Sequence, residues 1–168
     1  MRIANEWNRP VTHNEMTTRR VALVTGANKG IGRETARRLG ETGLTVFLAA
    51  RDRTAGETAA GRIVNVSSGL GSLTLNGDPG WEFAGVKFLG YSASKAALNM
   101  LTVQLAHELR DTPIKVNAAD PGFIATDLNG HRGRQTVEQG ARASVRLALL
   151  PEDGPSGGYF DAAGPLPW

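Results

Sequence analysis

The sequence predicts an α/β protein in which helices flank a mainly parallel sheet. Short, continuous apolar segments alternate with amphipathic segments along the chain, as buried strands and covering helices do. A strand, a glycine-rich turn, a helix and a second strand follow one another within about 30 residues, which is the pattern of a βαβ unit. Glycine accounts for 21 of 168 residues, well above its usual share of roughly 7%, and supplies the tight turns that alternating elements need.

The first half of the chain carries the βαβ pattern. Residues 21–24 are all apolar and predict a strand buried on both faces, as in a parallel sheet. Residues 30–41 predict a helix that ends at Gly43, and residues 44–50 predict a second buried strand. The residues expected to face inward on the helix are Ile31, Ala36 and Leu39.

The central part of the chain predicts a long loop between a strand and a helix. Residues 52–61 are polar and suggest one or two helical turns, and residues 62–66 predict a third strand. Residues 69–90 are rich in glycine and predict a loop that covers a site, in which Trp81 and Phe83 either line an apolar pocket or pin the loop down. Residues 92–110 predict the longest helix, with an apolar face formed by Leu98, Leu101, Leu105 and Leu109.

The last part of the chain repeats the alternation of strand and helix. Residues 114–118 predict a fourth strand, which Pro121 and Gly122 terminate. Residues 136–150 predict a helix that stops at a proline, and residues 158–161 predict a last short strand. The side chains expected to face inward on this helix are Val137, Ala141, Val145 and Ala148.

The length predicts one domain, residues 21–168, preceded by a disordered polar tail, residues 1–20. Met1 and Met16 are both candidates for the natural first residue, and the sequence favours neither. The net charge is +3 and the basic residues are scattered, so we expect no nucleic-acid surface. No apolar run reaches the roughly 18 residues of a membrane span, and the N-terminus has no signal-peptide core, so we expect a cytoplasmic protein without membrane contact.

The turn after the first strand predicts a site for a dinucleotide pyrophosphate. Gly26, Gly30 and Gly32 let the backbone approach an anion at the start of a helix, although such turns also serve as plain helix caps. The second strand ends without an acidic residue and is followed by Arg51, and Lys29 adds a second cation. Two cations suit the 2′-phosphate of NADP(H); the alternative for Arg51 is a surface ion pair.

A tyrosine and a lysine four residues apart predict proton transfer. Tyr91 and Lys95 lie on one face of a helix. A free phenol has a pKa of about 10, and a nearby ammonium group stabilises the phenolate and lowers that value. Tyr91 can then donate a proton to a carbonyl oxygen as hydride arrives at the carbon. Ser68, at the carboxyl end of a strand, can hydrogen-bond the same oxygen.

Four motifs in this order resemble the short-chain dehydrogenase/reductase family, in particular its NADPH-dependent, carbonyl-reductase-like members. They are residues 25–32 (TGANKGIG), 65–68 (NVSS), 91–95 (YSASK) and 120–126 (DPGFIAT). The resemblance implies a Rossmann-like fold and hydride transfer to a small carbonyl or alcohol substrate, with Ser68, Tyr91 and Lys95 as the catalytic residues. The residues that it implies for binding NADP(H) are Gly26, Asn28, Lys29, Gly30, Ile31, Gly32, Arg51, Tyr91, Lys95, Pro121, Gly122, Ile124 and Thr126.

The chain departs from the family between residues 51 and 62, where about two strand–helix units are missing. We expect the remaining strands either to close into one reduced sheet or to leave an unpaired seam, which is costly. The missing parts include a helix of the family's subunit interface, so a homodimer is weakened and the helix over 92–110 is left partly exposed. The alternative to an active enzyme is a catalytically impaired nucleotide-binding remnant.

Overall fold

The computed structural model describes residues 21–25, 27, 29–49 and 61–168. The predicted tail, the polar segment 52–61 up to Ala60, and the site candidates Gly26, Asn28 and Arg51 lie outside this part of the chain. Strands and helices alternate as the sequence predicts. The elements are β1 (Val21–Thr25), α1 (Gly30–Glu41), β2 (Thr45–Ala49), β3 (Arg62–Val66), η2 (Gly69–Gly71), α2 (Leu73–Gly77), α3 (Leu89–Glu108), β4 (Lys115–Ala119), η3 (Asp127–Asn129), α4 (Val137–Ala148) and β5 (Tyr159–Phe160).

The described strands form two parallel sheets. One sheet contains β1 and β2, and the other has the order β3–β4–β5. Val21 pairs with Thr45 in the first sheet, and Ile63 pairs with Val116 in the second. Of the two outcomes expected for the reduced sheet, the structure therefore shows the unpaired seam, since none of the described strands joins β1 to β3.

Apolar side chains of β1 and β3, the strands on either side of the seam, are partly exposed. The side chain of Leu23 in β1 is 43% exposed, and that of Val66 at the end of β3 is 38% exposed. The prediction of complete burial for residues 21–24 is thus wrong for Leu23. A parallel strand is covered on both faces only when neighbouring strands and crossover helices surround it, and β1 has a single partner strand among the described residues.

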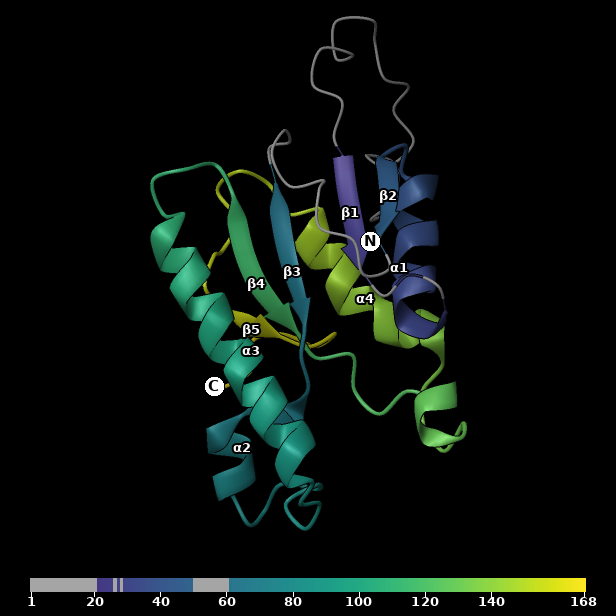
Figure 1. The fold of residues 1–168 in the computed structure, drawn as a ribbon, viewed down its shortest axis with the longest axis vertical. Helices are drawn as coiled ribbons and strands as arrows, with labels where there is room; N and C mark the ends of the chain where they lie inside the picture. Colours follow the sequence, from purple (N-terminus) through teal and green to yellow (C-terminus); the bar gives the residue numbers. More distant parts are fainter. Residues whose placement is uncertain (1–20, 26, 28, 50–60) are drawn as a thin grey trace, which may run out of the picture.

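Helices α3 and α4 cover opposite faces of the β3–β4–β5 sheet (Figure 1). The core between α4 and this sheet is formed by side chains from both, namely Ala119, Ala143, Leu147, Val64, Leu150 and Phe160. Helix α1 packs on β1 and β2 and also against α4, so the α1–α4 contact holds the two sheets together. Ala36 and Leu39 of α1 are buried as predicted.

Helix α3 is longer at its start than predicted, and it buries different residues. It begins at Leu89 instead of residue 92, and its buried residues are Asn99 and Thr102. The predicted apolar face is wrong for Leu101, which is 49% exposed. Its neighbour Met100 is 59% exposed, so the expectation that this helix is partly exposed is confirmed.

The segment predicted as an irregular loop over residues 69–90 contains two short helices. Ser68 caps the 3₁₀ helix η2, and its hydroxyl accepts a hydrogen bond from the Leu70 N–H. Ser72 caps α2 in the same way by accepting from the Leu75 N–H. The prediction missed both helices because each is short and is specified by its serine cap instead of an apolar period.

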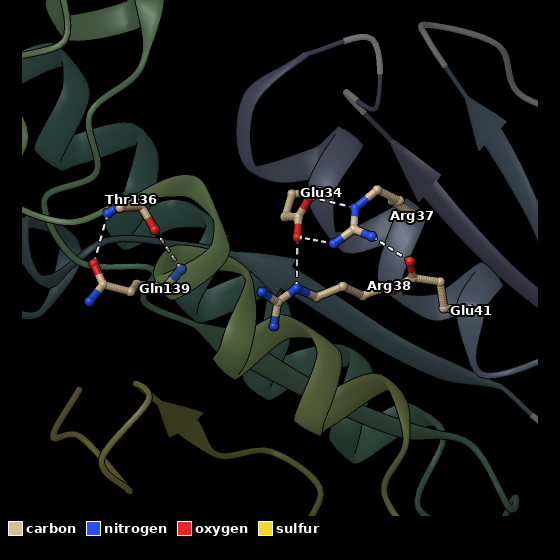
Figure 2. Close-up of polar contacts among 6 residues, drawn as sticks. All are labelled: Glu34, Arg37, Arg38, Glu41, Thr136 and Gln139. Carbon is tan, nitrogen blue, oxygen red and sulfur yellow. Dashed lines mark hydrogen bonds and ion pairs between the residues drawn. The ribbon is translucent and has the colours of Figure 1, made fainter. Parts of the chain in front are cut away.

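A cluster of charges stabilises α1 at its contact with α4. The Glu34 carboxylate accepts hydrogen bonds from Arg37 at 2.7 and 2.9 Å and from Arg38 at 2.7 Å, and Arg37 also pairs with Glu41 (Figure 2). The side chain of Glu34 is only 10% exposed. Hydrogen bonds from Arg37 and Arg38 outweigh its partial desolvation and lower the pKa of Glu34 from 4.5 to about 2.

We expect Glu34→Gln to destabilise the fold by about 1–2 kcal/mol at pH 7, since Arg37 and Arg38 remain partly solvated. The pKa of Glu34 is lower in the folded protein than in the unfolded protein. The ionised carboxylate therefore contributes its full stabilisation above pH 4.5, and this stabilisation is lost as the pH falls from there towards 2. Urea unfolding of both proteins across this range measures the difference. Glu41→Gln, at an exposed position of the same cluster, is the matched control with a smaller effect. A Glu34→Gln effect that is independent of pH would contradict this assignment.

Candidate active site

The tyrosine and lysine predicted to transfer a proton lie at the start of α3. The Lys95 ammonium nitrogen is 5.7 Å from the centre of the Tyr91 ring. The same nitrogen donates a hydrogen bond of 2.8 Å to the Val66 carbonyl oxygen, at the end of β3. Tyr91 is 40% exposed, so its ring lies at the surface of the site. The lysine is therefore fixed between the tyrosine and the strand that leads to Ser68.

Helix α3 is held against the end of β3 by buried polar side chains. Ser67 is buried and its hydroxyl donates to the Asn99 side-chain oxygen, while the Asn99 amide donates to the Gly71 carbonyl oxygen at 3.1 Å. One turn further along α3, Thr102 accepts a hydrogen bond of 2.9 Å from the Asn65 amide. Satisfied buried polar groups of this kind fix a single arrangement of their elements.

The contact between η2 and α3 requires a glycine. A β-carbon built at Gly71 would lie 2.6 Å from the Lys95 β-carbon and 2.7 Å from the Lys95 carbonyl carbon. Because the obstructing atoms include the backbone of α3, no side-chain rotation relieves the overlap. The absence of a side chain at Gly71 thus lets the loop that begins at Ser68 lie directly on Lys95, and the structure brings Ser68, Tyr91 and Lys95 to one end of β3.

Two effects act on the charge of Lys95. Burial disfavours the ammonium form and lowers the pKa of Lys95 below 10.5, whereas the nearby Asp120 carboxylate opposes this shift. Asp120 itself follows β4, and burial raises its pKa while hydrogen bonds from the Gly122 and Gly69 N–H groups act against that rise. Burial thus acts against the charged form of both Lys95 and Asp120.

The turn between β1 and α1 lies beside the segment that follows β4. Gly30 has a φ of +58°, the left-handed conformation that the glycine prediction requires. A β-carbon at Gly30 would be 3.7 Å from the Thr126 methyl group, and the Lys29 ammonium group pairs with Asp127 at 2.9 Å. The motifs over residues 25–32 and 120–126 thus lie against each other. Lys29 is paired with the Asp127 carboxylate instead of being free.

The remaining predicted binding residues lie in two places, the first turn of α1 and the segment after β4. Ile31 and Gly32 lie in the first turn of α1. Pro121 and Gly122 follow β4, where Gly122 has a φ of +83°. The side chain of Ile124 is 3% exposed and packs against Gly140 of α4, so only its backbone is available to a ligand.

Aromatic side chains connect the covering loop to the Pro121 segment. The rings of Trp81 and Phe83 meet edge to face at 5.5 Å, and those of Phe83 and Phe123 at 6.3 Å. Glu82, between them, pairs with Arg134 at 3.0 Å. These contacts hold the loop against Phe123, as one of the two alternatives for Trp81 and Phe83 expects, and the pocket-lining alternative stays a prediction.

Sequence reasoning assigned no role to Asp120, Asn99 or Asp127. Asp120 directly precedes Pro121 and Gly122, and an aspartate at this position of a turn commonly accepts the N–H two residues on, as it does here at 2.9 Å. That local signal could have marked Asp120. Asn99 and Asp127 act through residues 32 and 98 positions away, and no local pattern indicates such partners.

None of the described helices is long and apolar enough to cross a membrane. Within the same part of the chain, no group of three or more histidine, cysteine, aspartate or glutamate side chains is arranged to hold a metal ion.

Comparison with known proteins identifies the family. The family model described as short chain dehydrogenase matches residues 20–60 and 55–136. Salutaridine reductase from Papaver somniferum is 40% identical over 84 residues, which are 50% of this chain and 25% of that protein. The (+)-neomenthol dehydrogenase from Arabidopsis thaliana is 47% identical over 76 residues, 44% of this chain and 25% of the relative. A short-chain dehydrogenase/reductase from Pyricularia grisea, pyiH, is 32% identical over 142 residues, 80% of this chain and 55% of the relative.

Solved structures share the fold. The structure of salutaridine reductase from Papaver somniferum superposes with a TM-score of 0.68 at 21% identity, covering 84% of this chain and 99% of that one. The NADPH-bound carbonyl reductase from chicken fatty liver gives 0.65 at 19% identity, covering 90% and 95%. The aligned part of this chain spans only about a quarter of the length of the first two sequence relatives. On the family match, which spans well over half of its residues, the chain belongs to the short-chain dehydrogenase family, in which it has a reduced Rossmann-like fold.

Proposed function

We propose that this protein is an NADPH-dependent oxidoreductase that reduces a small carbonyl compound, with Tyr91 as the acid/base group. The observation that carries the proposal is the position of the Lys95 ammonium group, 5.7 Å from the centre of the Tyr91 ring and bonded to the Val66 carbonyl oxygen. One cation thus lies beside the phenol and beside the strand end that carries Ser68.

The residues at the start of α1 fit a phosphorylated dinucleotide. The helix cap, Lys29, makes no side-chain capping bond, and the first turn contains no acidic residue. Unpaired N–H groups and the positive end of the helix dipole favour an anion there. Arg51 would contact the phosphates, and Lys29 would do so on exchanging its Asp127 partner for a phosphate. Gly30, Ile31 and Gly32 would lie at the helix start, and residues 121–126 on the nicotinamide side. Solved structures of the same fold, one with bound NADPH and one with bound NADP, support this choice of cofactor.

The chemistry of reduction needs one hydride and one proton. NADPH, when bound, would supply the hydride for the carbonyl carbon. The Tyr91 hydroxyl donates its proton to the carbonyl oxygen, so that an alcohol forms and the phenol is reprotonated from solvent. Ser68 hydrogen-bonds the same oxygen and orients it, while Lys95 stabilises the phenolate that Tyr91 leaves behind.

We expect the purified protein to consume NADPH in the presence of small aldehydes, ketones or quinones and to form the corresponding alcohols or hydroquinones. Absorbance at the nicotinamide wavelength measures cofactor loss, and mass spectrometry with hydride-deuterated NADPH shows whether the label reaches the product carbon when a ketone is used. Consumption that does not depend on the carbonyl compound, or product without deuterium, would contradict the proposal.

A second function, a catalytically impaired nucleotide-binding remnant, is favoured by the separation of the sheets. Short-chain dehydrogenases bind their cofactor over the carboxyl ends of a continuous sheet, whereas β1 and β3 are unpaired with each other in the described structure. This alternative predicts saturable NADPH binding without carbonyl-dependent turnover, and the two assays together separate it from an active enzyme.

A further inference from the structure

Asp120 occupies the point where three strand ends meet. It follows β4, and its backbone N–H donates to the Phe160 carbonyl oxygen of β5 at 2.7 Å. One carboxylate oxygen accepts the Gly69 N–H at 3.0 Å, and the other accepts the Gly122 N–H at 2.9 Å. Gly69 directly follows Ser68 in the loop after β3. A single side chain therefore joins the serine loop to the segment at the other side of the proposed site.

We propose that Asp120 is a positioning residue that clamps the Ser68 loop to residues 121–126. The proposal rests on the proposed function for its catalytic part, whereas the clamp itself is a property of the protein without ligand. Asp120 acts through the position of the Ser68 loop, whose Gly69 N–H its carboxylate accepts.

The surroundings of Gly69 show that the clamp is closely packed. A β-carbon at Gly69 would lie 3.2 Å from the nearer Asp120 oxygen and 2.8 Å from a ring carbon of Trp81. The loop is thus held from two sides, by the carboxylate and by the aromatic ring. An amide at position 120 offers only one acceptor oxygen, so it can satisfy only one of the two N–H groups.

The test compares Asp120→Asn with Asp161→Asn in the full chain. Asp161 is a matched control, since its carboxylate also accepts two backbone N–H groups, those of Ala163 and Gly164 at 2.7 and 2.8 Å, but within its own turn. We expect Asp120→Asn, and not the control, to accelerate hydrogen exchange about tenfold at whichever of the Gly69 and Gly122 amides loses its acceptor, relative to β4 amides in the protein without ligand. Unchanged exchange at both glycines overturns the clamp, whether or not the protein turns over.

The kinetic constants test the positioning role in catalysis. We expect Asp120→Asn to reduce kcat more than it raises KM, because the Ser68 loop is no longer held at the site, whereas Asp161→Asn changes neither constant as much. Equal changes in both variants overturn this role. Should Asp120→Asn fail to fold, hydrogen exchange in the unaltered protein decides, since the Gly69 and Gly122 amides should be protected although Gly69 is the first residue of η2 and Gly122 lies outside the helices and strands. Exchange at both amides as fast as in an unstructured peptide contradicts the proposal.

Discussion

Tyr91→Phe is expected to lower kcat for carbonyl reduction by about 10²–10⁴-fold, the usual contribution of a positioned general acid. The substitution removes one oxygen atom from a ring that is 40% exposed, so we expect little change in stability. Since the ring itself remains, NADPH affinity should be nearly unchanged. Steady-state kinetics and a binding titration on the same preparation measure both quantities.

The second tyrosine of the chain provides the matched control for this variant. Tyr159 is 1% exposed and its ring stacks on Trp168 at 5.3 Å, while its hydroxyl has no hydrogen-bond partner of good geometry. We expect Tyr159→Phe to reduce kcat far less than Tyr91→Phe does, because the Tyr159 hydroxyl faces the Asp120 carboxylate and donates no proton in the proposed mechanism. Equal loss of activity in both variants would show that Tyr91 is not the acid.

Gly71→Ala should destabilise the protein by about 1–3 kcal/mol, the usual cost of overpacking against a backbone. The added methyl group would overlap Lys95 in α3 and push the Ser68 loop away from the lysine. We therefore expect a loss of kcat beyond that explained by the unfolded fraction. Urea unfolding and kinetics at a temperature where the variant is folded measure the two effects separately.

Gly77→Ala, at the end of α2, is the control for Gly71→Ala. No atom lies within 4 Å of a β-carbon built at Gly77, so the same chemical change should cost nothing there. If Gly71→Ala is as stable and as active as Gly77→Ala, the close packing of the Ser68 loop on Lys95 is not required.

Much of the fold could be predicted from local patterns. The strand β1 is a continuous apolar run, and α1 buries Ala36 and Leu39 at the expected helical spacing. These elements are specified by residues close to one another in the chain. The seam between β1 and β3 could be stated only as one of two alternatives, because strand pairing depends on residues far apart in sequence.

The contacts that assemble the site were less predictable. Periodicity assigns leucines to the buried face of α3, yet the structure buries Asn99 and Thr102 there, because each finds a partner in the segment around β3. A polar residue can be buried when its hydrogen bonds are satisfied, and the sequence does not show those partners. The pairing of Lys29 with Asp127 is hidden for the same reason.

Titration of the protein with NADPH and with NADH, followed by nicotinamide fluorescence, tests most directly whether the reduced fold keeps a working cofactor site. We predict saturable binding of NADPH that is tighter than binding of NADH and that persists in Tyr91→Phe. The absence of saturable binding at millimolar NADPH would contradict the assignment as an oxidoreductase and leave only the shared ancestry with the family.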